Sequence, residues 1–468
     1  MHPPAVIADS PRRWLRGRWV GFIVVTAAAL VLGAQVGRGS GVVIAGVAAA
    51  IAVSWAAYRL PQTFVVGALL TGMVPQVLQM TTVLPTEWMT LPGGARLEDL
   101  FLVGMAGAAA WCIASRGWRA GTSPWARAAI ASAVLFFGWA LLEVARNLGT
   151  YGISALGEFR FRYLIIALPL FVAVRLSDEG SRRRMATFLW GASVPLVLAA
   201  IPVIGALKGW GIGAESRYLP ASISLALLYG VAWMLIASRA GVLRVPTFLI
   251  ALMTILGGVM VFVDSHRSVW LVLLVLVLAF LLLGELQLRR AWAWGLATVS
   301  IIGVVAIVAM SGGVDPLAYL STRGGALVDP LSDPTSAWRI YLWQANLNEL
   351  AASPFLGSGL GGFWNVYVPE LAANVTVSPH SLFVQTAVKL GAVGLALYLW
   401  VSVTAARVLI KARSVADRLG ASDRVLVVAG IAACAGSLAF HLTYSLEYAG
   451  LTWIGLGLAA AMGAEAQR

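Results

Sequence analysis

Long apolar segments recur along the whole 468-residue chain, and they restrict its fold more than any other feature. A helix needs roughly 17 to 25 apolar residues to cross the ~30 Å hydrocarbon core of a bilayer. The chain is 60% hydrophobic and only 11% charged, whereas about a quarter of the residues of soluble domains carry a charge. The sequence therefore predicts an all-α, polytopic integral membrane protein. Fourteen segments have the required length, namely 18–36, 41–58, 62–80, 97–115, 126–145, 160–178, 184–205, 218–237, 245–264, 267–285, 292–311, 380–409, 424–442 and 446–463.

The distribution of Lys and Arg orients the chain, because these residues accumulate on the cytoplasmic side of membrane proteins. With a cytoplasmic N-terminus, only eleven of the 33 Lys and Arg residues fall outside, so we expect both termini to be cytoplasmic. The very short connection Arg59-Leu60-Pro61 leaves twelve crossings as an alternative, which keeps both termini on the same side. The net charge of +13 is then mainly a topological signal and does not indicate nucleic-acid binding.

Two further features restrict the class of the protein. Basic residues precede segment 18–36, but no small-residue cleavage site follows it, so we expect a retained helix and not a removed signal peptide. Cys112 and Cys434 both lie within apolar segments, which predicts neither a disulfide nor a metal cluster.

One long interval, residues 312–379, breaks the succession of apolar segments, and the topology places it outside. Within it, Trp338 and Leu342 fall on one face of a capped helical stretch, which predicts an amphipathic helix at the membrane surface. The glycine-rich stretch 357–362 would allow the backbone to approach a ligand closely, and long ordered loops of this kind usually carry function. The chain thus divides into N-terminal transmembrane helices (1–311), an extracytoplasmic loop (312–379) and C-terminal transmembrane helices (380–468).

Five arginines fall at predicted helix ends or on the loop helix of the outer side. An arginine at membrane depth is costly without a partner, so each is a functional candidate. A nearby Glu beside Arg160, Arg162 and Arg217, and Asp264 beside Arg267, would also explain these arginines singly as parts of local ion pairs. Gathered on one face, they would form a basic cavity that binds a diphosphate through bidentate guanidinium contacts. The five are Arg160 and Arg162, which begin the predicted helix 160–178, Arg217, which begins another, Arg267 in a very short turn, and Arg339 on the loop helix.

The other outward basic residues have plainer explanations. Lys389 lies nine residues after His380 and points away from it on a helix, so we expect it to snorkel or to pair internally. The residues expected to face solvent or lipid headgroups are Arg38, Arg96, Arg146, Lys208 and Arg323.

His380 is the strongest candidate for a general base. Ser378 is a plausible helix N-cap and Pro379 suits the first helical position, which would place His380 in the first turn. There the helix dipole favours a neutral imidazole, the form that a general base needs. Gly391 and Gly394 would lie about three turns below on the same stripe and leave a smooth strip for a neighbouring helix or a lipid tail. The alternative is an interfacial histidine beside a small-residue packing face.

The sequence around His380 resembles that of bacterial O-antigen ligases and of the related O-antigen polymerases. The resembling signature is His380-Ser381, followed after nine residues by Gly391-x-x-Gly394. Arg267 at a short outer turn and Arg217 at a helix start are also similar to arginines of that superfamily, and the resemblance covers roughly residues 205–400. The upstream residues similar to its loop segment are Arg339, Trp343, Pro354, Gly357, Gly359, Gly361 and Phe363.

The resemblance implies a GT-C-like bundle of about 12–14 transmembrane helices in the bacterial inner (plasma) membrane. It implies a metal-independent glycosyltransferase that moves a glycan from a polyprenyl diphosphate carrier to a hydroxyl of a glycan or glycolipid acceptor. Arg217, Arg267 and Arg339 would hold the diphosphate and stabilise its charge as it leaves, with His380 positioning or deprotonating the acceptor. Membrane lipids would be the surrounding partners, and no cofactor is implied. Further residues expected to contact substrate are Arg160, Arg162, His266, Trp343, Gly359, Gly361 and Ser381.

Metal and nucleotide chemistry find little support in the sequence. No His, Cys, Asp and Glu cluster has metal-ligand spacing, and the chain lacks a phosphate-binding Gly-Lys-Ser/Thr loop. The alternative is that Asp264 or Glu215 turns inward and completes a metal site.

Two other functions remain open at this point. An O-antigen-type polymerase would use another lipid-linked repeat unit as the acceptor. A lipid-linked oligosaccharide flippase or other transporter would suit fourteen helices, but it predicts an internal repeat and midplane charges. The sequence shows neither of these, and the large outer loop suits an enzyme better.

Overall fold

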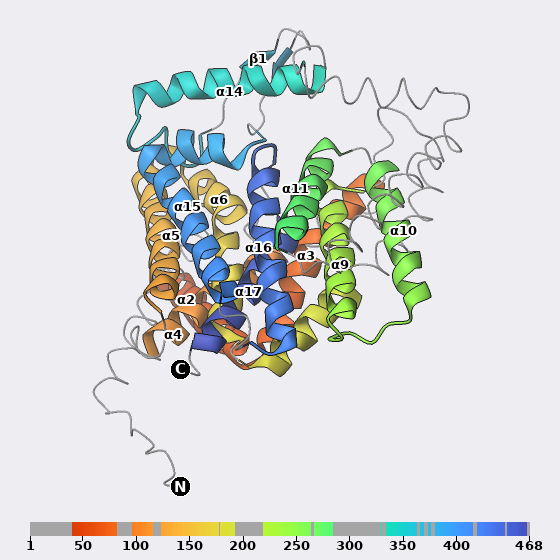
Figure 1. Cartoon of the computed structure of the whole chain (residues 1–468). Coiled ribbons are helices and arrows are strands. Elements are labelled where there is room, and N and C mark those ends of the chain that lie inside the picture. Colours follow the sequence, from red (N-terminus) through yellow and green to blue (C-terminus); the bar gives the residue numbers. More distant parts are fainter. Residues whose placement is uncertain are drawn as a thin grey trace.

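The computed structural model is a bundle of long helices with one helix, α14 (Pro334–Ala352), lying across one end (Figure 1). We call this end the α14 end. The predicted spans 18–36 and 292–311 and the candidate Arg217 lie outside the described residues. The residues that the structure describes are 40–81, 96–115, 123–176, 178–191, 219–263, 266–283, 329, 334–362, 366–368, 373–375, 380–414, 419–444 and 447–465.

Most predicted spans correspond to helices within a few residues of the expected limits, which confirms the all-α class. The predicted spans 41–58 and 62–80 form two separate helices, with the single residue Leu60 between them. The predicted span 184–205 is helical over 179–191, up to the end of its described part. The helices are α2 (Ser40–Arg59), α3 (Pro61–Thr81), α4 (Leu97–Ser115), α5 (Pro124–Tyr151), α9 (Ala221–Arg239), α10 (Thr247–Val263), α11 (Arg267–Leu283), α15 (Leu382–Ser414), α16 (Ala421–His441) and α17 (Ala449–Glu465).

Five of the described helices, α4, α5, α9, α15 and α16, are long and apolar enough to cross a bilayer. The chain is therefore a multi-pass membrane protein. Two short strands, β1 (Val366–Val368) and β2 (Ala373–Val375), pair antiparallel beside α14 (Figure 1). They are a local feature of the predicted outer loop and do not change the fold class.

The predicted span 160–178 is wrong in its limits and its continuity. The chain turns at Gly152, whose φ of 55° suits a residue without a Cβ. It then forms three short pieces, α6 (Ile153–Arg162), the 3-10 turn η3 (Leu164–Ile166) and α7 (Ala167–Arg175). Arg160 and Arg162 consequently end a helix instead of beginning one.

The end of the bundle opposite α14 is held by paired charges and is rich in arginine. Arg182 is buried and donates from Nε to Asp423 Oδ1 at 2.9 Å, which joins the 179–191 helix to the start of α16. Arg175 donates from Nε to the carbonyl of Tyr58 at 2.9 Å, which joins the ends of α7 and α2. The last turns of α2, α7, α9 and α15 also carry basic residues, including Arg59 and Arg239.

Candidate functional site

Four segments that are distant in sequence meet beneath the first half of α14. They are the start of α11, the first turns of α14, the residues before α15 and the end of α16. Contacts among His380, Arg339, Trp338 and Tyr444 join three of them, and a hydrogen bond from Arg267 to Ser336 joins the start of α11 to α14. We call His380, Arg339, Arg267, Trp338 and Tyr444 the His380 site.

Aromatic rings surround the His380 imidazole. The ring centroids of Trp338 and His380 lie 5.2 Å apart with an interplanar angle of 86°, and those of His380 and Tyr444 lie 6.0 Å apart at 87°. Both contacts are edge-to-face, the arrangement that aromatic rings prefer. The Arg339 guanidinium carbon lies 5.5 Å from the Tyr444 ring centroid and 5.7 Å from that of Trp338. The site thus brings a titratable base and a permanent cation onto the same two rings.

Two predicted residues at the start of α11 lie beside this group. Arg267 donates from a terminal guanidinium nitrogen to Ser336 Oγ at 2.9 Å, which ties α11 to the first turn of α14. His266 is buried, contacts the carbonyl of Leu219 through Nε2 at 2.8 Å, and lies edge-on to the Tyr444 ring at 6.4 Å. The structure therefore assembles Arg267, His266, Arg339 and His380 in one place, as a shared site requires.

The prediction that His380 lies in the first helical turn is wrong. The helix begins at Leu382, and Ser381 Oγ accepts the N–H of Val384 at 3.4 Å, as an N-cap residue does. His380 itself has a φ of 50°. Such a left-handed conformation is uncommon for a residue with a Cβ, and it persists where the surrounding structure imposes it, as at many functional sites. The aromatic rings, and not a helix axis, therefore orient the imidazole.

The prediction of an unbroken glycine stripe below His380 is also wrong. Gly391 adopts φ 69° and ψ −174°, which kinks α15 within its span. The kink frees three helix carbonyls, which accept hydrogen bonds from Ser358 N (to Val388, 2.8 Å), Gly359 N (to Lys389, 3.1 Å) and Trp139 Nε1 (to Leu390, 3.0 Å). The glycine-rich stretch 357–362 thus packs into the kink and satisfies its backbone.

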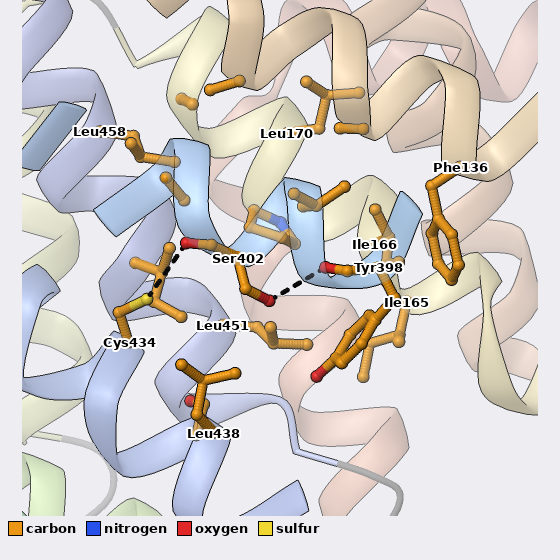
Figure 2. Close-up of a pocket in the computed structure, with 18 of the residues that line it drawn as sticks. Phe136, Ile165, Ile166, Leu170, Tyr398, Ser402, Cys434, Leu438, Leu451 and Leu458 are labelled. Carbon is orange, nitrogen blue, oxygen red and sulfur yellow. Dashed lines mark hydrogen bonds between the residues drawn. The ribbon is translucent and has the colours of Figure 1, made fainter. Parts of the chain in front are cut away.

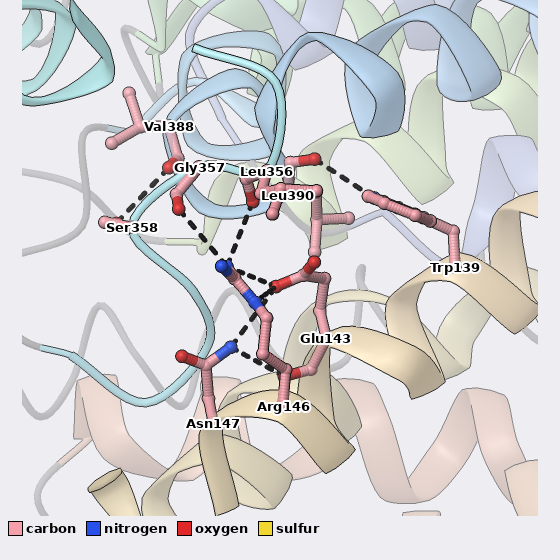
Figure 3. A network of polar contacts seen from close by, with 9 residues as sticks. All are labelled: Trp139, Glu143, Arg146, Asn147, Leu356, Gly357, Ser358, Val388 and Leu390. Atoms are coloured by element: carbon pink, nitrogen blue, oxygen red, sulfur yellow. Dashed lines mark hydrogen bonds and ion pairs between the residues drawn. The ribbon is translucent and has the colours of Figure 1, made fainter. Parts of the chain in front are cut away.

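A polar network on α5 holds the same stretch from the other side (Figure 3). Arg146 donates to the carbonyls of Leu356 and Gly357, each at 3.2 Å, and to Glu143 at 2.8 Å. Asn147 donates to the carbonyl and the carboxylate of the same Glu143. Arg146 is exposed, as expected of a residue that faces solvent or headgroups, but it also binds the loop carbonyls, which the sequence did not predict.

The predicted substrate glycines lie against the body of the protein. The N–H of Gly361 donates to Glu158 Oε2 at 2.7 Å, and a Cβ at Gly359 would overlap the Asn147 side chain. Glu158 also pairs with the buried Lys389 at 3.1 Å, which confirms the expected internal pairing of that lysine. In the described residues, these glycines therefore serve close packing of the stretch, and their contact with substrate stays a prediction.

Replacing Gly391 with alanine is expected to prevent the normal packing of α15. A Cβ there would overlap the carbonyl of Phe355, and the combination of φ 69° and ψ −174°, which is essentially limited to glycine, adds a strain of about 1–3 kcal/mol. Thermal unfolding of the purified protein in detergent should show a large fall in midpoint, with less protein recovered from membranes. Gly138→Ala is the matched control, because a Cβ at that helical glycine meets nothing within 4 Å. Equal stability of the two variants would contradict the role given to the kink.

Four described candidates remain, namely Arg160, Arg162, Trp343 and Ser381. Arg160 pairs with the buried Asp99 at 3.2 Å, an ion pair with a distant helix, whereas the ion-pair alternative considered the neighbouring Glu158. Trp343 lies on α14 one turn beyond Arg339, and Ser381 directly follows the histidine. Arg162 lines a separate cavity. The role of each as a substrate contact stays a prediction.

That cavity, of about 110 Å³, runs between α5, α7, α15, α16 and α17 and is lined mostly by apolar side chains (Figure 2). Its polar lining includes Tyr398, whose hydroxyl contacts Nδ1 of the buried His441 at 2.7 Å, and Glu447, 3.9 Å from the other side of the same imidazole. Ser381 Oγ donates to the carbonyl of His441 at 3.4 Å. The cavity wall is thereby linked to the residue that caps α15 beside His380.

Within the described residues, no group of three His, Cys, Asp or Glu side chains is placed to hold a metal ion. Asp264 and Glu215, the two acids considered for an inward-turned metal site, lie outside that part of the chain. A metal-free reaction therefore stays a prediction.

Sequence reasoning missed Tyr444, which contacts both His380 and Arg339. It follows α16 in a connection of ordinary composition, so its residue type alone carried no signal. Its spacing from the signature histidine, more than sixty residues downstream, also falls outside the resembling segment.

Comparison with known proteins agrees with the geometry. Residues 250–399 match the family model described as O-antigen ligase, and this segment includes Arg267, Arg339, His380 and the kink at Gly391. A search of curated proteins finds no match. The match supports a function of the O-antigen ligase or polymerase type in general. Residues 250–399 are therefore similar to the O-antigen ligase family, within an all-α, multi-pass membrane protein.

Proposed function

We propose that the protein is a glycosyltransferase that moves a glycan from a polyprenyl diphosphate carrier to a hydroxyl of a glycan or glycolipid acceptor. The observation that carries this proposal is the shared aromatic contact of His380 and Arg339. An imidazole and a guanidinium meet the same aromatic ring there, at one end of a transmembrane bundle, which supports a pairing of proton acceptor and fixed cation. Transfer of a sugar away from a diphosphate needs both groups at once.

The chemical step follows from these roles. The acceptor hydroxyl oxygen attacks the anomeric carbon of the donor sugar and forms the new glycosidic bond. The bond between that carbon and the diphosphate oxygen breaks, and both of its electrons stay with the diphosphate. His380 takes the proton of the attacking hydroxyl. Arg339 and Arg267 stabilise the charge that develops on the leaving polyprenyl diphosphate, as preorganised donors do in other transfer reactions.

The reaction side is proposed from the distribution of charge. The last turns of α2, α7, α9 and α15, at the end away from α14, carry Arg59, Arg175, Arg239, Lys411 and Arg413. Basic residues of this kind mark the cytoplasmic side. The His380 site would then face the extracytoplasmic side of the bacterial inner membrane, with both termini in the cytoplasm.

The purified protein should transfer glycan in the absence of divalent metal. Arginines supply the countercharge, and the diphosphate is the leaving group, which needs neutralising more than activating. The assay incubates the protein in lipid nanodiscs with a lipid extract of the producing cells, with and without excess EDTA, and follows the release of polyprenyl diphosphate. Loss of activity in EDTA that Mg²⁺ or Mn²⁺ restores would reject the metal-free mechanism.

The product of the same assay separates ligase from polymerase. Mass spectrometry of a ligase reaction should show the glycan on a lipid other than polyprenyl diphosphate, or on another non-polyprenyl acceptor. A polymerase would instead lengthen the glycan on its polyprenyl diphosphate carrier. No release of polyprenyl diphosphate under any condition would reject the transferase function itself.

A further inference from the structure

We propose that Tyr444 is a positioning residue that holds the His380 imidazole and the Arg339 guanidinium in a fixed mutual orientation. The inference rests on the proposed function and adds a residue that lies outside the segment matched by the family model. Its basis is that one ring touches the side chains of both proposed catalytic residues.

The Tyr444 ring has contacts with four side chains from four segments. The imidazoles of His380 and His266 approach it edge-to-face, at 6.0 Å and 6.4 Å with interplanar angles of 87° and 89°. The Arg339 guanidinium lies over it at 5.5 Å, within the range of a cation–π interaction. Phe440 stacks on it at 5.0 Å with an interplanar angle of 16°. A ring so surrounded fixes its neighbours through shape and quadrupole, without a bond to any of them.

The backbone that carries Tyr444 is itself anchored. The N–H of Tyr444 donates to the carbonyl of Phe440 at 2.9 Å, which continues the last turn of α16. The neighbouring Thr443 hydroxyl lies 2.9 Å from that of Ser268 on α11. The carbonyl of His441 accepts the hydroxyl of Ser381, the residue after His380, at 3.4 Å. The end of α16 thus connects the two segments that carry Arg267 and His380.

This arrangement explains what orients the His380 side chain, although His380 precedes α15 and is not part of that helix. With a φ of 50°, His380 is not held by the hydrogen bonds of a helical turn. The rings of Trp338 and Tyr444 pack against its imidazole and restrict its orientation instead. Trp338 comes from the same helix as Arg339, whereas Tyr444 follows α16, so the Tyr444 ring relates α14 to the end of α16. Loss of its ring would leave both catalytic residues present but free to shift, and shifts of about 1 Å cost about 10²-fold in rate.

The test compares Tyr444→Leu with Tyr444→Phe in nanodiscs, with donor concentration varied. We expect Tyr444→Leu to lower kcat about 10- to 100-fold and to change the KM for donor much less, because orientation matters most in the transition state. Tyr444→Phe keeps the ring and should recover most of the activity. Tyr58→Leu is the matched control, because it also removes a tyrosine ring beneath an arginine, with the Arg175 guanidinium 4.7 Å from its centroid at the opposite end of the bundle.

A double variant separates positioning from general loss of stability. If Tyr444 acts through Arg339, then Tyr444→Leu should lower kcat much less in an Arg339→Ala background than in the unmodified protein. Equal, additive losses would overturn the inference, as would normal kcat in Tyr444→Leu. If Tyr444→Leu does not yield folded protein, Phe440→Leu takes its place, because it removes the ring stacked on Tyr444. We expect Phe440→Leu to lower kcat as well. An unchanged kcat in that variant would count against the inference.

The same series distinguishes this inference from the proposed function. If Arg339→Ala and His380→Asn keep normal activity, the proposed function is wrong and the positioning role is overturned with it. If both abolish transfer while Tyr444→Leu transfers normally, the function stands and only the role of Tyr444 is rejected.

Discussion

Replacing His380 with alanine is expected to lower glycan transfer by roughly 10²- to 10⁴-fold, the usual effect of removing a general base. The imidazole lies between Trp338 and Tyr444, beside Arg339, where an attacking hydroxyl and a leaving diphosphate would meet. Transfer should be followed as polyprenyl diphosphate released from the lipid extract, together with the amount of protein recovered from membranes. Normal product from the alanine variant would show that His380 is an interfacial histidine without a catalytic role.

The conformation of His380 calls for a second variant. Alanine is strained at a φ of 50°, so part of any loss in His380→Ala would come from the backbone. Asparagine tolerates this region better and has no basic nitrogen. We therefore expect His380→Asn to fold and elute as the unmodified protein does, and to be as inactive as the alanine variant. Activity restored by asparagine would point to a backbone role instead of proton transfer.

Replacing Arg339 or Arg267 with lysine is expected to lower transfer by about 10²- to 10³-fold, as the loss of one preorganised donor does elsewhere. Lysine keeps the charge but loses the planar fork that binds phosphate oxygens in pairs and lies flat on aromatic rings. Arg339 lies over two rings and Arg267 bonds Ser336, and both geometries depend on the guanidinium. The same loss is expected for Arg217→Lys.

Arg407→Lys is the matched control for these arginines. Its guanidinium carbon lies 5.0 Å from the ring centroid of Trp125, toward the opposite end of the bundle. We expect it to transfer at nearly the unmodified rate, since it loses the same kind of cation–π contact away from the site. Full activity in all the lysine variants would show that Arg339, Arg267 and Arg217 are structural, with Arg267 and Arg217 in the ion pairs that their neighbouring acids first suggested.

Hydropathy alone determined the membrane class and most helix limits, because a span needs a minimum apolar length whatever its neighbours are. Hydropathy separated the two spans on either side of Leu60, because each segment is long enough to form a span by itself. It did not predict the break between α6 and α7, because an apolar average does not register local turns.

The sequence also indicated the site residues that belong to one recognisable segment. Arg267, Arg339 and His380 were expected to act together; in the structure His380 and Arg339 share the Tyr444 ring, Arg267 bonds Ser336 on the helix that carries Arg339, and the joint role stays a prediction. Residue type was informative here because charge and an imidazole are rare and costly in an apolar chain.

Only the tertiary structure decided what orients these residues. A glycine in an apolar helix predicts a smooth stripe or a kink equally well, and the choice at Gly391 depends on whether another segment can bind the freed carbonyls. Arg146 likewise binds Leu356 and Gly357, which lie more than two hundred residues away in sequence. In the sequence, nothing distinguishes Tyr444 from other aromatic residues. The position of α16 in the bundle places it against His380 and Arg339. Such contacts depend on side chains from separate helices meeting at one point, which no local pattern in the chain encodes.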